Sequence, residues 1–301
     1  KRMDNSGTPK LKPVITWMGG KRRMLESIIP SVPEYNGTYY EPFIGAGAVF
    51  LALKPKKAVI SDANKDIINM WKQIKQRPDK LIKMLTSHKI TEEHWNKCNV
   101  EFSTTKHNTV KRASLFCFLV CYGFGGIYKL KSNGSFQNTF SIKKHKNNKA
   151  IPFQRQIKNI HNISLYMNSS KIKIICKDYN SVIKNCKRGD FVYADPPYVS
   201  KAKKTSLMYE TQFDHTELCD NFKNLSNRRV LCMLSNLNTT VITTQLKQFN
   251  IKGIKQKIQW RLNKKGNLKN KKIARGNNFR NEILITNFKC KESPRCFIRN
   301  L

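Results

Sequence analysis

Acidic residues are scarce in this sequence, which has 19 Asp and Glu against 57 Lys and Arg in 301 residues and a formal net charge of +38. Lys, Asn and Ile are abundant, as in a chain from an AT-rich genome, but that codon bias should supply acidic residues as well. A polyanionic partner accounts for the asymmetry better, because Lys and Arg neutralise phosphates and release counterions. The composition therefore predicts binding to nucleic acid. No basic amphipathic helix is evident that would favour a membrane surface instead.

The sequence also lacks an apolar run long enough to span a membrane. Its polar first 12 residues lead into no apolar segment of the kind found in secretory signal peptides. No two of the nine Cys form a CxxC pair, and the six His lie near none of them at zinc-finger spacing, so we expect no metal site. Cys inside apolar runs, as in 113–124, are typical of small buried side chains in a reducing compartment. We expect an intracellular protein, in a bacterial cytoplasm or, for a viral source, in the host cytoplasm or virion.

Short β-rich runs alternate with helical spacers along most of the chain, which predicts an α/β fold with a largely parallel sheet and helices on both faces. These runs are 38–44, 56–62, 171–178, 189–198, 228–236 and 281–288. The stretch 86–170 differs, because it combines an apolar helix candidate at 113–122 with a loop rich in Gly, Asn and aromatic residues. We predict one domain built from 1–85 and 171–301, interrupted by a mostly helical insert at 86–170.

A glycine-containing turn follows the first β-rich run. Gly45 and Gly47 would let the backbone approach a ligand closely, and Asp62 ends the next run 17 positions after Gly45, where an acid can bind ribose hydroxyls. Phe50 stands where the dinucleotide fingerprint has its third glycine, which disfavours a nicotinamide cofactor. A plain tight turn beside a solvated acid is the alternative interpretation.

A second segment, Asp195-Pro196-Pro197-Tyr198, ends the β-rich run at 189–198. Two prolines fix φ and remove N–H donors, so the Asp195 carboxylate and the Pro196 carbonyl become two acceptors with fixed directions. When two acceptors form hydrogen bonds with the N–H groups of an exocyclic amine, its lone pair becomes available for attack on an electrophile. The ring of Tyr198 offers a surface on which a base can stack. A structural Pro-Pro turn is the alternative.

The order of these segments resembles the Dam-like family of DNA adenine-N6 methyltransferases (D12 class, α group), from about Val14 to Phe288. The similar stretches are TWMGGKRRML, EPFIGAGAVFLAL, SDANKDI, ADPPY, FDHTELCDNFKNL with SNLNT, and RNEILITNF. The resemblance implies a Rossmann-like S-adenosylmethionine-dependent methyltransferase domain and an inserted target-recognition domain. It also implies methyl transfer without a metal to N6 of an adenine flipped out of double-stranded DNA, as in restriction-modification.

The resemblance assigns roles to individual residues. The expected catalytic residues are Asp195, Pro196, Pro197 and Tyr198. The expected cofactor-binding residues are Trp17, Lys21, Phe43, Gly45, Gly47, Asp62, Asp178 and Asp195. The expected DNA-binding residues are Tyr128, Lys129, Asn133 and Asn138.

Departures from the family pattern leave several questions open. Lys129 replaces an amide in the segment that reads DNA, and the loop after it is two residues longer, so the recognition sequence stays open, a GATC-like target included. An RNA adenine-N6 methyltransferase and a catalytically inactive nucleic-acid-binding relative are the alternatives. The oligomeric state is open, with a monomer or weak dimer expected.

Other residues have simpler interpretations. His94 and His215 are expected at the surface or as helix caps, and Trp71 and Trp95 in the core. The Lys-rich segment 264–272 is either a flexible loop or a phosphate contact.

Overall fold

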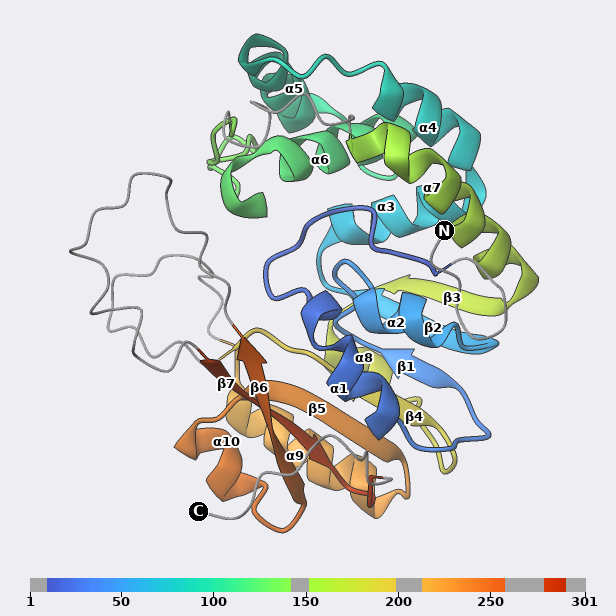
Figure 1. Cartoon of the computed structure of the whole chain (residues 1–301), viewed down its shortest axis with the longest axis vertical. Helices are drawn as coiled ribbons and strands as arrows, with labels where there is room; N and C mark the ends of the chain where they lie inside the picture. The colour runs from blue at the N-terminus through green and yellow to red at the C-terminus, as the bar shows by residue number, and fades with distance from the viewer. Residues whose placement is uncertain (1–9, 142–151, 199–212, 258–278, 291–301) are drawn as a thin grey trace, which may run out of the picture. The chain divides into compact units, whose positions relative to one another are not determined.

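The computed structural model describes residues 10–141, 152–198, 213–257 and 279–290 (Figure 1). The chain divides into two compact units. Unit 1 consists of Lys1–Leu25 and Gly37–Cys186, and unit 2 consists of Glu26–Asn36 and Lys187–Leu301. The Lys-rich segment 264–272 lies outside the described residues. Among the helices of the described part of the chain, none is long and apolar enough to cross a membrane.

The strands of unit 1 pair in parallel, with β2 (Lys57–Asp62) between β1 (Tyr39–Glu41) and β3 (Lys171–Cys176). The register sets Glu41 opposite Ile60 and Asp62 opposite Cys176. The carboxyl ends of these strands therefore meet at one edge, which is where open α/β sheets bind ligands.

Four of the helices described in unit 1 begin at side chains that cap their first turns. Asn64 accepts hydrogen bonds from the N–H groups of Asp66 and Ile67, and Thr91, Thr109 and Asp178 cap later helices in the same way. The helices of this unit are α2 (Ala48–Leu53), α3 (Lys65–Gln76), α4 (Pro78–Thr86), α5 (Glu92–Thr104), α6 (Val110–Tyr122), α7 (Pro152–Ser169) and α8 (Tyr179–Ile183). A short α1 (Leu25–Ile28) precedes them.

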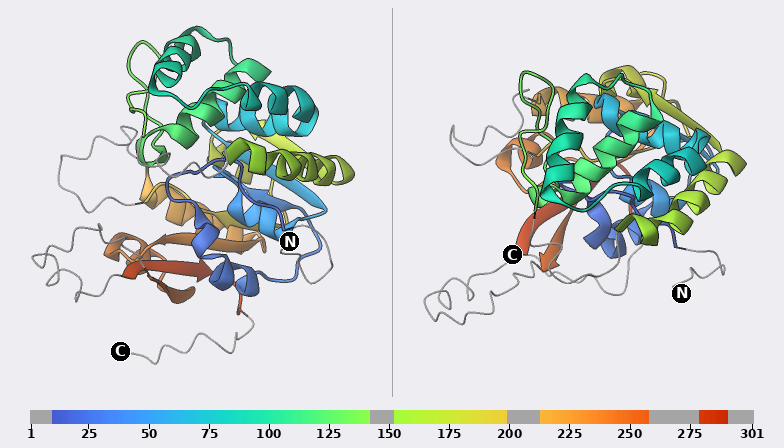
Figure 2. Two further views of the ribbon diagram at one scale, coloured as in Figure 1. Left: turned by 45° about the horizontal axis from the view of Figure 1, so that its top comes forward. Right: turned by 90° about the horizontal axis from the view of Figure 1, so that it is seen from above.

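Helices α4 to α7 gather in one group within unit 1, and α6 contacts α3, α4 and α5 (Figure 2). The apolar run predicted as a helix at 113–122 lies in α6, which is buried along nearly its whole length. Trp71 and Trp95 are each 1% exposed, so the prediction that they belong to the core is confirmed. The predicted insert 86–170 lies wholly within unit 1, and its status as a separate domain stays a prediction.

Unit 2 contains four strands in the order β4 (Phe191–Ala194), β5 (Leu231–Leu237), β7 (Phe279–Thr286) and β6 (Asn250–Lys257). β4 and β5 are parallel, but β7 runs antiparallel to both β5 and β6. Helix α9 (His215–Asn227) packs on β5 and on α10 (Thr240–Gln245). Parallel pairing, as expected for most of the sheet, therefore joins β1 to β2, β2 to β3 and β4 to β5, and the antiparallel pairs are those of β7 with β5 and β6.

The described residues contain seven strands flanked by helices, and this mixed α/β architecture confirms the predicted Rossmann-like methyltransferase fold. The six β-rich runs of the sequence correspond to β1, β2, β3, β4, β5 and β7. The strand that sequence reasoning missed is β6, where Ile251 and Ile254 are accompanied only by polar residues and glycine.

Candidate active site

The loop after β1 is tied to the end of β2 by one carboxylate. Asp62 accepts the backbone N–H of Gly45 through Oδ2 at 3.0 Å and that of Asn64 through Oδ1 at 2.9 Å. Because β1 and β2 are parallel neighbours, their carboxyl ends bring these groups together although Gly45 and Asp62 are 17 positions apart. The predicted association of the glycine turn with this acid is thus a direct hydrogen bond.

Burial raises the pKa of Asp62 to about 6, and the backbone donors Asn64, Gly45 and Ala63 offset only part of that rise. Desolvation disfavours a charged carboxylate, whereas hydrogen bonds to it favour the charge. A polar ligand that donates further hydrogen bonds would stabilise the ionised form. The arrangement is therefore suited to hydroxyl donors such as those of a ribose.

Both glycines of the loop occupy backbone conformations and spaces that a side chain would disturb. Gly45 has φ of +43°, and a Cβ there would lie 2.9 Å from Trp17 Cδ1. Gly47 has φ of +67°, and a Cβ there would clash with Trp71 Cζ2. The Trp71 indole N–H also donates to the Gly45 carbonyl at 3.0 Å. Two tryptophans from distant segments therefore shape this turn.

Of the remaining predicted cofactor residues of unit 1, Phe43 and Asp178 follow β1 and β3 at the same sheet edge, and Lys21 begins a short 3-10 helix that contacts α2. Lys21 is buried, and its ammonium donates to the Gly19 carbonyl at 2.8 Å. The ring of Phe43 lies 5.1 Å from that of Tyr179, the first residue of α8. Asp178, an exposed residue, accepts the Asn180 N–H at 2.8 Å as the cap of α8, and the Ser181 hydroxyl chiefly lowers its pKa. In this structure Asp178 is therefore engaged as a helix cap.

A cavity of about 390 Å³ lies elsewhere in unit 1 and is lined by none of the predicted cofactor residues. Its walls include Tyr40, Val59, Lys173, Lys177 and Ser181. The cavity is therefore not the site that the glycine loop and Asp62 build.

In unit 2 the acid Asp195 follows β4 directly, as predicted. The Ser235 hydroxyl of β5 donates to Asp195 Oδ1 at 2.8 Å and lies 3.0 Å from the Tyr193 hydroxyl. The parallel register that sets Ala194 opposite Leu234 brings Ser235 beside Asp195. The carboxylate is thus oriented by a side chain 40 positions away.

Tyr198 is anchored by a buried acid. Its hydroxyl donates to Glu282 Oε2 at 2.8 Å, and Glu282, on β7, is 3% exposed. Burial raises the pKa of Tyr198, and the charges of Asp195 and Glu282 raise it further. Sequence reasoning did not single out Ser235 or Glu282, although an acid inside the apolar run 281–286 was a signal for the latter.

The predicted DNA-reading loop, residues 123–138, is held by several internal hydrogen bonds. Asn133 accepts from the Ser135 hydroxyl at 2.7 Å, and the Asn138 amide donates to the carbonyls of Phe124 at 2.8 Å and Ile127 at 3.2 Å. Lys129 belongs to the same loop, and its carbonyl accepts the Gln137 N–H. In this structure the two Asn side chains shape the loop, and their contact with DNA stays a prediction.

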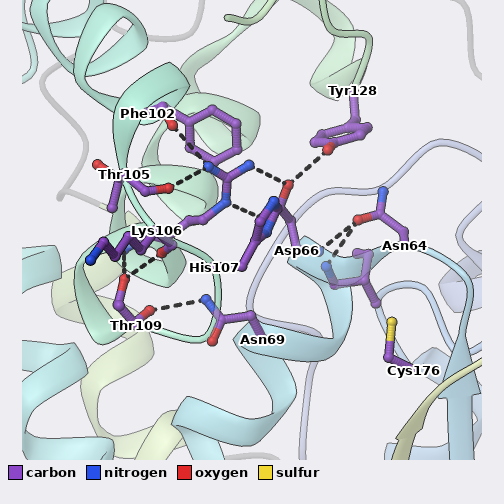
Figure 3. A network of polar contacts seen from close by, with 12 residues as sticks. Asn64, Asp66, Asn69, Phe102, Thr105, Lys106, His107, Thr109, Tyr128 and Cys176 are labelled. Atoms are coloured by element: carbon purple, nitrogen blue, oxygen red, sulfur yellow. Dashed lines mark hydrogen bonds and ion pairs between the residues drawn. The ribbon is translucent and has the colours of Figure 1, made fainter. Parts of the chain in front are cut away.

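Tyr128 joins that loop to a buried charge network in unit 1 (Figure 3). Its hydroxyl donates to Asp66 Oδ2 at 2.8 Å, and Asp66 also forms an ion pair with Arg112 at 2.6 Å. Burial raises the pKa of Tyr128, and Asp66 raises it further. Its ring lies 5.9 Å from that of Trp17. Tyr128 therefore contacts both the insert and the predicted cofactor segment, a connection not foreseen from the sequence.

Residues 17–259, which contain the glycine turn, Asp62 and the Asp195 segment, match the family model described as D12 class N6 adenine-specific DNA methyltransferase. The chain belongs to this family. The methyltransferase is 35% identical to the Type II methyltransferase M1.LlaDCHI of Lactococcus lactis subsp. cremoris, over 80% of this chain and 86% of that protein. It is 30% identical to the Type II methyltransferase M.MjaIII of Methanocaldococcus jannaschii, over 93% of this chain and 100% of that protein.

A more distant similarity links the methyltransferase to the DNA adenine methylase of Escherichia coli (strain K12), with 25% identity over 76% of this chain and 82% of that protein. Family membership confirms the predicted resemblance and the predicted class of enzyme, an adenine-N6 DNA methyltransferase. It implies a methyl donor and a DNA substrate.

Proposed function

We propose that this methyltransferase transfers the methyl group of S-adenosylmethionine to N6 of an adenine flipped out of double-stranded DNA. The observation that carries the proposal is the Asp195 carboxylate at the end of β4, oriented by the Ser235 hydroxyl at 2.8 Å. The match to the D12 class supports the choice of adenine and of DNA over RNA or a role in binding alone.

Asp195 acts as a hydrogen-bond acceptor in this mechanism. The exocyclic amine of adenine is a weak nucleophile because its lone pair is delocalised into the ring. When Asp195 and the Pro196 carbonyl accept its two N–H groups, the nitrogen moves toward tetrahedral geometry and its lone pair becomes available. Donors or acceptors that are already oriented before reaction stabilise a transition state most effectively, and Ser235 provides that orientation here.

The residues of unit 1 fit S-adenosylmethionine, with Gly45 and Gly47 keeping side chains out of the turn and Asp62 accepting ribose hydroxyls. Bound S-adenosylmethionine supplies an electrophilic methyl group on a positively charged sulfur. The amine nitrogen, held by Asp195 and the Pro196 carbonyl, would attack that carbon as the carbon–sulfur bond breaks, and it would then release one proton to solvent. Correct positioning of two reactants can lower a barrier by up to about 7–11 kcal/mol.

Recognition of DNA falls to the basic surface and to the insert loop. The net charge of +38 favours a phosphate backbone, and we assign Tyr128, Lys129, Asn133 and Asn138 to the DNA side of the molecule. Flipping a base costs a few kcal/mol, which stacking on Tyr198 would offset.

The deciding experiment is a single-turnover transfer of labelled methyl groups to duplex DNA, single-stranded DNA and RNA. We expect duplex DNA to be labelled, and Asp195→Ala to slow transfer by about 100- to 1,000-fold because an oriented acceptor is lost. The matched control is Asp220→Ala on α9, which removes an exposed acid that pairs with Lys223 and should leave the rate unchanged.

Thermal melts establish that both variants fold. A folded Asp195→Ala protein with a normal rate would contradict the proposed role of Asp195. Labelling of RNA alone would support the RNA enzyme, and a folded wild-type protein that labels no substrate would support the inactive relative.

A further inference from the structure

Three side chains outside the active site bring metal-binding atoms together in the insert. His94 and Cys98 lie four residues apart on α5, and His88 lies in the connection between α4 and α5. His88 Nδ1 is 3.0 Å from His94 Nε2, and Cys98 Sγ is 3.3 Å from His94 Nε2 and 3.6 Å from His88 Nδ1. All three atoms lie within 4.8 Å of one another.

These separations resemble the edges of a tetrahedral zinc site. Zinc binds His nitrogen at about 2.0–2.1 Å and Cys sulfur at about 2.3 Å, so tetrahedral angles separate two nitrogens by about 3.3 Å and nitrogen from sulfur by about 3.6 Å. The three observed distances differ from these values by no more than about 0.3 Å. We propose that His88, His94 and Cys98 bind Zn²⁺, with a water molecule as the fourth ligand.

The surroundings hold the two imidazoles in a ligating state. His88 Nε2 lies 2.9 Å from the Ser114 hydroxyl. In the tautomer that would bind the metal, the hydrogen on Nε2 donates to Ser114 and the Nδ1 lone pair is left for the metal. The His88 ring stacks on Phe118 at 4.4 Å, and the His94 ring meets the same Phe118 edge-on at 5.5 Å.

The expectation of no metal site depended on zinc-finger spacing, and this cluster does not have that spacing. His94 and Cys98 share one face of a helix because residues four apart are neighbours there. The turn between α4 and α5 brings His88 to that face, and the spacing of Cys and His in the sequence does not indicate this turn. His94, expected at the surface or as a cap, is half-buried in this cluster.

The test uses the full chain, treated with a chelator and then titrated with Co²⁺, which replaces zinc and is visible by absorption. We expect one equivalent of Co²⁺ per chain, with a thiolate charge-transfer band and the visible bands of tetrahedral cobalt, and displacement of Co²⁺ by Zn²⁺. Cys98→Ser should remove the charge-transfer band. Ser114→Ala should keep the stoichiometry but weaken affinity by about 10- to 100-fold, because it releases the hydrogen bond that orients His88.

Cys176→Ser and His161→Ala are the matched controls, since each changes an exposed or half-exposed residue of unit 1 outside the cluster. Both should bind Co²⁺ as the wild type does. Circular dichroism verifies folding, and His94→Gln replaces Cys98→Ser if that variant fails to fold. Absence of the cobalt bands in the wild type, or their survival in Cys98→Ser and His94→Gln, would overturn the proposal. No methylation is measured, so the outcome is independent of the proposed function.

Discussion

At the residue scale, the polar partners of the catalytic segment come from strands far along the chain. Tyr198 reaches Glu282 across 84 positions, and Asp195 reaches Ser235 across 40. A buried acceptor that loses its donor costs more than the net value of the hydrogen bond, because the group stays desolvated. The hydroxyl of Tyr198 therefore has a structural role beside the stacking role that we propose for its ring.

Replacing Tyr198 with Phe tests that role. Tyr198→Phe keeps the ring but leaves the Glu282 carboxylate without this donor, so the free energy of unfolding should fall by about 1–3 kcal/mol. In a Glu282→Gln background the buried charge is gone, and the same change should cost less. Urea unfolding of the four proteins in this double-mutant cycle measures the difference. Equal costs in both backgrounds would show that the hydroxyl does not stabilise the fold through Glu282.

The raised pKa of Asp62 makes the free energy of unfolding depend on pH. Its pKa is about 6 in the folded protein, against about 3.9 in an unfolded chain. Between these values the unfolded state has lost the proton that the folded state retains. The contribution of Asp62 to stability is therefore complete below about pH 4 and decreases as pH rises to about 6, by up to about 3 kcal/mol.

The measurement compares urea unfolding of the wild type and of Asp62→Asn from pH 4 to pH 8. The wild type should lose stability relative to the variant as pH rises from 4 to 6, and the difference should then remain constant. A relative gain for the wild type over that range would mean that the pKa of Asp62 is lowered by its backbone donors.

At the scale of elements, helix α5 supports the insert loop through the side chains of Asn99 and Phe102. Asn99 accepts the Phe136 N–H at 2.6 Å and donates to the Phe136 carbonyl at 3.0 Å. Phe136 is fully buried, and its ring meets that of Phe102 on the same helix at 5.0 Å. The loop is therefore fixed to α5 at its main chain as well as by an apolar contact.

Asn99→Ala should loosen the loop without unfolding unit 1. Loss of both bonds should speed hydrogen exchange of the Phe136 amide by about tenfold or more and weaken DNA binding, while binding of the methyl donor stays unchanged. Exchange mass spectrometry of peptides covering 130–141 measures the first effect. Asn96→Ala, an exposed site on the same helix, is the control. Unchanged exchange at Phe136 would show that the apolar contact alone holds the loop.

Helices and strands with a regular apolar pattern could be predicted from the sequence. Strand β6, which lacks such a pattern and forms by pairing with β7, was missed. The run 113–122 is apolar enough to identify α6 by itself. β6, with Ile251 and Ile254 as its only apolar side chains, is a strand because β7 pairs with it along its whole length. Similarly, Gly45 and Asp62 could be assigned to one site from the sequence, because Gly45 follows β1 and Asp62 ends β2, its parallel neighbour. The hydrogen bond from Tyr128 to Asp66 depends on loop conformation, which no spacing encodes.

At the scale of the whole molecule, composition and motif order together are enough to identify the class of enzyme. The charge of +38 indicates a polyanionic partner, and the order of the glycine turn, insert and Asp195 segment indicates the family to which the chain belongs. The division of the chain into two units could not be predicted in the same way, because each unit combines stretches that are far apart in the sequence. Residues 26–36 belong with 187–301, and no change in composition marks the point where the chain passes from one unit to the other.

The bonds between Asn99 and Phe136 have a consequence for how target choice can change. Asn99 bonds to the main-chain N–H and carbonyl of position 136, which every amino acid except proline supplies, so these two hydrogen bonds do not depend on the identity of most side chains in the loop. Exposed positions such as Lys131, Ser132 and Gln137 can then diverge while the loop keeps its path. Under the proposed role of this loop in reading DNA, substitutions at these exposed positions should change the target sequence, in evolution or in a selected library, while the fold of unit 1 stays the same.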